Sequence, residues 1–116
     1  MKVKELADLI SGNVLTASEA ALENEVLCGM TSDLLDHALA HAAPGCAWLT
    51  VHTHMTVLAI AIVNKMSCVI LPDGTMMSDA ELKTADEANF PIISSGLSSF
   101  EICGIMYAHD IPAAQK

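Results

Sequence analysis

The stretch CAWLTVHTHMTVLAIAIVNKMSCVIL, from Cys46 to Leu71, decides the fold of this chain. Its first part, 46–51, is an apolar run broken by one threonine, which is typical of a strand buried on both faces. A polar turn, 52–54, leads into a largely apolar helix, 55–65, and a second apolar strand follows at 67–71. A strand, a helix and a strand joined by short connections predict a βαβ unit with parallel strands.

The same alternation continues on both sides of this unit. Upstream, 26–30 reads as a strand and 34–41 as a helix. Downstream, Ser78 and Glu81 form a capping box for a helix at 79–88, and 90–93 is a short strand. A last helix begins at Ser98 or Ser99 and runs to about 107 or 108.

The N-terminal part adds a helix over 2–10, ended by Gly12, and a short strand over 13–16. Residues 17–25 have no clear period and are expected to be an acidic connection, and 109–116 to be a tail. The whole pattern predicts an α/β fold, a mainly parallel sheet of about four to five strands flanked by helices. Right-handed crossovers would then place every strand-to-helix turn on one edge of the sheet.

Composition limits the function of this fold. The chain has 116 residues, which fits one domain, and 53% of them are hydrophobic but only 3% aromatic. Its formal net charge is −9, with five lysines and no arginine. Nucleic-acid binding is therefore not expected, because it needs clustered cations. An anion site would have to use backbone N–H groups at helix N-termini.

Cysteine usage and apolar run lengths indicate a soluble cytoplasmic protein. The four cysteines, Cys28, Cys46, Cys68 and Cys103, form no CxxC pair and read as buried free thiols of a reducing compartment. The N-terminus does not resemble a signal peptide. The longest apolar run, 55–63, is too short to span a bilayer.

Several segments together resemble the DRTGG-domain family. They are Val3-Lys4-Glu5-Leu6, Gly12-Asn13-Val14-Leu15-Thr16, Val26-Leu27-Cys28-Gly29, Ser32-Asp33-Leu34-Leu35, Pro44-Gly45-Cys46-Ala47-Trp48-Leu49-Thr50, Val69-Ile70-Leu71-Pro72-Asp73-Gly74, Phe90-Pro91-Ile92-Ile93-Ser94 and Ser98-Ser99-Phe100-Glu101. The resemblance covers nearly the whole chain and implies one DRTGG-like domain over 1–116. It also implies a three-layer sandwich similar to the N-terminal domain of HPr kinase/phosphatase.

Members of this family are regarded as ligand-binding or regulatory modules without established chemistry, and the resemblance implies the same role for this chain. Small stand-alone members imply a redox or metabolic enzyme as partner, or assembly within a hydrogenase-related complex. Kinase activity is not expected, because the chain has no glycine-rich phosphate loop with its lysine and no kinase catalytic domain. No cofactor is expected either.

The expected ligand site lies at the strand exits, where open parallel sheets bind ligands. Its centre is His52, Thr53 and His54, with Thr31, Ser32 and Asp33 after the neighbouring strand; Asp73, Gly74, Ser94, Ser95, Gly96 and Ser98 would complete the edge. A small anionic or nucleotide-like molecule would bind there. The alternative is that these residues are helix caps and solvated turns.

Three further hypotheses remain open. His37 and His41 share a helix face, and His52 and His54 alternate, so a histidine-based metal site is conceivable, although no recognised zinc spacing is completed. Enzymatic activity is not expected, because no Gly-x-Ser-x-Gly elbow occurs. The apolar helix at 55–63 needs cover on most sides, which predicts a homodimer or another protein interface.

Overall fold

A computed structural model describes residues 1–114, and within them a five-stranded sheet has the order β1-β5-β4-β3-β2. The four strands β2 to β5 are parallel, and β1 pairs antiparallel with β5. The mainly parallel α/β sheet expected from the sequence is thus confirmed. The strands are β1 (Gly12–Val14), β2 (Cys28–Thr31), β3 (Cys46–Leu49), β4 (Cys68–Leu71) and β5 (Ile92–Ser95).

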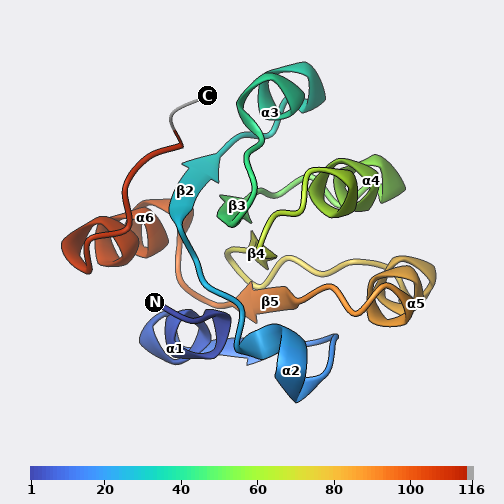
Figure 1. The fold of residues 1–116 in the computed structure, drawn as a ribbon, viewed down its shortest axis with the longest axis horizontal. Helices are drawn as coiled ribbons and strands as arrows, with labels where there is room; N and C mark the ends of the chain where they lie inside the picture. The colour runs from blue at the N-terminus through green and yellow to red at the C-terminus, as the bar shows by residue number, and fades with distance from the viewer. Residues whose placement is uncertain (115–116) are drawn as a thin grey trace.

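Helices cover both faces of the sheet and make a three-layer sandwich (Figure 1). They are α1 (Val3–Leu9), α2 (Glu19–Leu22), α3 (Leu35–His41), α4 (Met55–Val63), α5 (Asp79–Glu87) and α6 (Ser99–Ala108). The connecting helices α3, α4 and α5 lie on one face, because β2 to β5 follow one another in the sheet by crossovers of one hand. Helices α1 and α6 lie on the other face.

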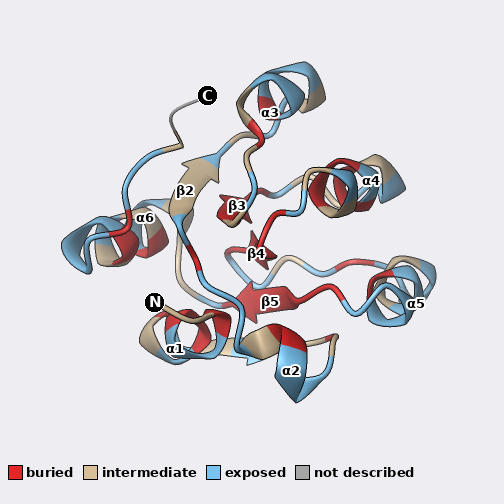
Figure 2. Cartoon of the chain, in the orientation of Figure 1, coloured by how far each residue is buried: buried red, intermediate tan, exposed pale blue. Residues whose placement is uncertain are grey.

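The core consists of two apolar layers, one on each side of the sheet. Trp48, Leu58 and Val69 belong to the layer under α3, α4 and α5, and Leu6 and Ile70 to the layer under α1 and α6. Strands β3, β4 and β5 are fully buried (Figure 2). None of the helices in residues 1–114 has the length and apolar character that crossing a membrane requires.

Two expectations for the first third of the chain were wrong. Residues 17–25 contain a helix, α2, a single turn whose Ala21 is buried. One turn is too short to produce a hydrophobic period, so the sequence pattern did not reveal it. Strand β2 begins at Cys28 rather than 26, because Val26 pairs with the N-terminal residue: its N–H donates to the Met1 carbonyl at 2.7 Å.

The expected tail is also partly ordered. Between 109 and 114, the chain turns back after α6 and forms a parallel bridge between Ala113 and Gly29 of β2. Residues 115 and 116 of the expected tail lie outside the described residues. The ordered part therefore covers the open edge of β2, and Ile111 is buried.

Candidate functional site

The carboxyl ends of β2 to β5 lie on one edge of the sheet, and every residue of the expected ligand site lies at or next to this edge. Only part of the set lines a common hollow. This polar hollow has a volume of about 530 Å³ and is lined by Val51, His52, Thr53 and His54 before α4 and by Ser78 and Glu81 at the start of α5.

The two histidines of the hollow differ in their bonding. The Nδ1 atom of His54 accepts the N–H of Thr56 at 3.2 Å and lies 2.9 Å from the Thr56 hydroxyl, so His54 caps α4. An Nδ1 that accepts carries no proton, and Nε2 therefore carries the proton of the neutral ring. The His52 ring lies 6.2 Å from the His54 ring, tilted by 56°. Under the helix-cap alternative Thr53 would cap α4, but His54 holds that position.

A capping box forms the other wall of the hollow. The backbone N–H and the hydroxyl of Ser78 both donate to Oε1 of Glu81 at 2.9 Å, and the Glu81 N–H donates to the Ser78 hydroxyl at 3.3 Å. The sequence predicted this capping box as a helix start only. Because α4 and α5 follow neighbouring strands, their first turns meet, and this adjacency is how the sequence could have placed Ser78 and Glu81 in the site.

Asp33 and Thr50 hold the turn behind the hollow. One carboxylate oxygen of Asp33 accepts the Thr50 hydroxyl and the Val51 N–H, both at 2.9 Å. The Thr50 hydroxyl in turn accepts the His52 N–H at 3.0 Å. Buried Thr50 was missed by the sequence reasoning, since it reads as one more strand residue.

The expectation that Ser32 or Asp33 caps α3 was wrong. Leu34 occupies the cap position without a side-chain bond, because the Asp33 carboxylate is bonded to the neighbouring strand exit. Ser32 instead lies 3.0 Å from Nδ1 of His37, and its carbonyl accepts the Trp48 indole N–H at 2.9 Å. Thr31, Ser32 and Asp33 do not line the polar hollow.

The turns after β4 and β5 bond to each other. The Asp73 N–H donates to the Leu97 carbonyl at 2.8 Å, and the Gly74 N–H to the Ser95 carbonyl at 2.9 Å. The Ser95 hydroxyl donates to the Ile10 carbonyl at 2.7 Å, and Ser98 caps α6.

The helices after β4 and β5 lie on opposite faces of the sheet, and a sheet of this kind usually opens a ligand-binding crevice between two such strands. Here these backbone bonds link the two turns, and Asp73, Gly74, Ser94, Ser95, Gly96 and Ser98 do not line the polar hollow.

Within residues 1–114, neither His37 with His41 nor His52 with His54 gains a third side chain placed to bind a metal ion. The rings of His37 and His41 stack with centroids 4.2 Å apart, and Nδ1 of His41 bonds the His37 carbonyl at 2.9 Å. Among residues 1–114, no group of three or more His, Cys, Asp or Glu side chains is placed to hold a metal ion.

Comparisons with known proteins bear on the fold. Neither a family profile nor a curated protein matches this chain in sequence. Among solved structures it is similar to the CBS and DRTGG domains of the regulatory region of Clostridium perfringens pyrophosphatase, solved with the activator diadenosine tetraphosphate. The TM-score is 0.72 at 15% identity, and the match covers 90% of this chain and 45% of the other. The similarity to HPr kinase/phosphatase stays a prediction, and this chain has a DRTGG-like α/β fold.

Proposed function

We propose that this chain is a regulatory domain that binds a nucleotide-like molecule in the polar hollow without transforming it. The observation that carries the proposal is the hollow itself, which lies at the carboxyl ends of two central parallel strands and joins the first turns of α4 and α5. Ligands of open α/β sheets bind at this edge.

The side chains of the hollow suit the uncharged part of a nucleotide. The Glu81 carboxylate can accept from ribose hydroxyls or a base amino group, and the imidazoles of His52 and His54 offer ring faces and N–H donors. No lysine lines the hollow, and the chain has no arginine. The Thr56 N–H already donates to His54 and the Val57 N–H to the His54 carbonyl, so phosphates would meet chiefly the Thr53 hydroxyl and the N–H of Met55, and point toward solvent.

The raised pKa values of two buried thiols support the proposal that this chain does not transform its ligand. Burial raises the pKa of Cys46 above its ordinary range and that of Cys68 to about 12, so both are neutral thiols at physiological pH. The Ser95 hydroxyl is buried and bonded to a backbone carbonyl. These groups serve as small core residues rather than nucleophiles.

The structural neighbour supports a regulatory role, and the cysteines bear on the compartment. The structural neighbour belongs to the regulatory region of an enzyme and was solved with a dinucleotide activator. A metabolic or redox enzyme is accordingly the partner class that we propose for this chain. Its four cysteines are free, which fits a reducing cytoplasm.

The binding proposal is tested by calorimetry with adenosine, AMP, ATP and diadenosine tetraphosphate. We expect saturable binding that a combined His52→Ala and Thr53→Ala variant weakens at least ~10-fold, about 1.4 kcal/mol. Because phosphates gain little here, adenosine and AMP should bind within a few-fold of each other. A matched control, Thr84→Ala with His109→Ala, changes exposed residues away from the hollow and should bind normally. Equal binding by both double variants would disprove the site.

A homodimer is a second proposal, favoured by the outer face of α4. Met55, Ala59 and Val63 are exposed on this face, and Val63 is 78% exposed. In sedimentation velocity, Val63→Glu should shift the protein to monomer. Phe100→Glu, on α6 of the opposite layer, should leave the dimer intact. A monomeric parent protein, or dissociation only by the Phe100 variant, would contradict the α4 interface.

A further inference from the structure

A separate apolar cavity lies between α6, the outer edge of β2 and the C-terminal segment. We call it the C-terminal cavity; its volume is about 230 Å³. Its lining includes Gly29, Met30, Leu49, Cys103, Met106 and Ile111. It shares no lining residue with the polar hollow.

The C-terminal segment forms one wall of this cavity. The Gly29 N–H donates to the Pro112 carbonyl at 2.8 Å, and the Ala114 N–H donates to the Gly29 carbonyl at 3.0 Å. Ile111 is 5% exposed and belongs to the apolar layer under α6. Residues 111–113 line the cavity, which is partly open to solvent, so this wall exists only while the C-terminal segment lies on β2.

Met106 and Ile111 can approach β2 this closely because residue 29 is a glycine. A Cβ atom there would lie 2.7 Å from the methyl carbon of Met106 and 3.5 Å from Cγ2 of Ile111. Any larger residue would displace the methyl group of Met106, which itself lines the cavity. Met106, whose flexible side chain can adapt to ligands of different shape, lines the cavity beside Gly29.

We propose that the C-terminal cavity is a second ligand site, for a small uncharged apolar molecule, and that its occupancy holds the C-terminal segment on β2. Dry apolar cavities of about 150 Å³ bind benzene, so this one has room for a fused ring such as indole. No charged side chain lines it, and a buried charged group would lose its hydration without a partner. Burial raises the pKa of Cys103, which keeps that thiol neutral.

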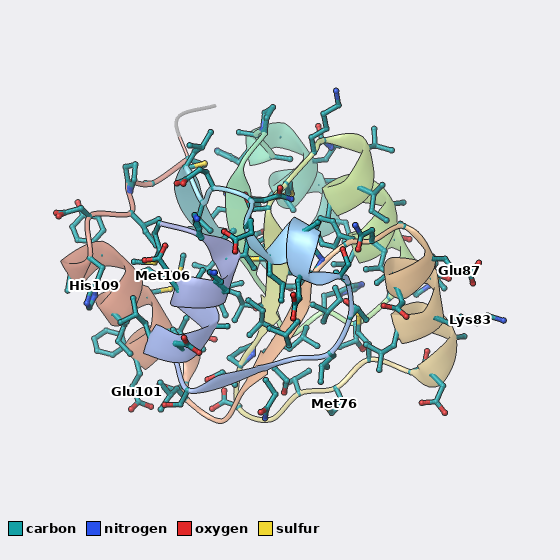
Figure 3. The ribbon with its side chains drawn as sticks, turned by 60° about the horizontal axis from the view of Figure 1, so that its bottom comes forward. Met76, Lys83, Glu87, Glu101, Met106 and His109 are labelled. Atoms are coloured by element: carbon teal, nitrogen blue, oxygen red, sulfur yellow. The ribbon has the colours of Figure 1, made fainter. Side chains whose placement is uncertain are left out.

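The probe is indole, compared with indole-3-acetate, which carries the same ring and a negative charge. Methionine methyl NMR on the full chain reads the site directly. We expect a saturable shift of the Met106 methyl group, which belongs to the layer under α6, with indole and at least 10-fold weaker binding of the acetate. Met76, which is 53% exposed in the loop before α5, is the internal control and should not shift (Figure 3).

Two filling variants and one control variant test the cavity, and one pair of amides tests the coupling. Cys103→Leu fills the space and should abolish indole binding, whereas Cys103→Ser keeps the volume and should bind. Gly29→Ala is a second filling variant that acts through Met106. Hydrogen exchange at Gly29 and Ala114 should slow with indole. An unshifted Met106 methyl group, or indole binding that survives both filling variants, would refute the site; unchanged exchange despite binding would refute the coupling.

Discussion

The polar hollow and the C-terminal cavity lie on the same sheet but are built in opposite ways. The hollow consists of residues at two helix starts, where His54, Ser78 and Glu81 cap their own helices, and of His52 and Thr53, which are only half-buried. The cavity is lined partly by the core residues Leu49, Met106 and Ile111, and one of its walls is a segment added to the edge of β2. Binding residues can therefore change in the hollow without disturbing the core, whereas in the cavity binding and stability depend on the same side chains.

Truncation of one residue from each region gives the largest expected contrast. Ile111→Ala removes a buried side chain and should lower the free energy of unfolding by about 2–4 kcal/mol. His52→Ala should change it by less than about 0.5 kcal/mol, because no packed side chain is lost. Urea unfolding at neutral pH measures both. A similar loss in the two variants would break the comparison.

Substitution of Asp33 tests whether the polar hollow can be disturbed without disturbing the C-terminal cavity. Asp33→Ala removes two hydrogen bonds to the turn after β3 and should destabilise the fold by about 1–2 kcal/mol. It should also weaken nucleotide binding, because the turn that carries His52 loses its anchor, while indole binding stays unchanged. Thr50→Val, which removes the hydroxyl that donates to Asp33 and accepts the His52 N–H, is the matched comparison and should act in the same direction. Equal loss of both ligands would show that the regions are not independent.

The sequence predicted the parts of both regions that depend on local pattern. The helix α5 (Asp79–Glu87) followed from Ser78 and Glu81, and the buried strand β3 (Cys46–Leu49) from the apolar run at 46–51, although Val51 is exposed. It did not show the partner of Asp33, because a carboxylate near a helix start has several possible donors and only the folded neighbour selects one. Nor did it show the cavity: Ile111 is a single apolar residue beside a proline, without any period.

The two capping boxes separate helix stability from site geometry. Ser78→Ala and Ser98→Ala each remove the same cap, and each should cost about 1 kcal/mol in thermal or urea unfolding. Only the Ser78 variant alters a wall of the polar hollow, so only it should also weaken nucleotide binding. If the Ser98 variant weakened binding to the same extent, the effect would come from general loosening rather than from the hollow.

The smallest expected effect concerns an ion-pair cluster that belongs to neither region. Lys2 and Lys4 each approach the Glu23 carboxylate at 2.6 Å, and hydrogen bonds from Lys2 and then Lys4 lower the pKa of Glu23 from 4.5 to about 2. A carboxyl whose pKa is lowered by folding adds stability above its unfolded pKa, and loses it as the pH falls toward the folded value. The difference in Tm between the parent protein and Glu23→Gln should therefore be present at pH 6 and shrink as the pH falls from about 4.5 to 2.

Because the side chains of this ion-pair cluster are exposed, salt should reduce the difference in Tm. Neither ligand should sense it: a salt-dependent affinity at the polar hollow would mean that charge, rather than the uncharged part of the nucleotide, governs recognition there.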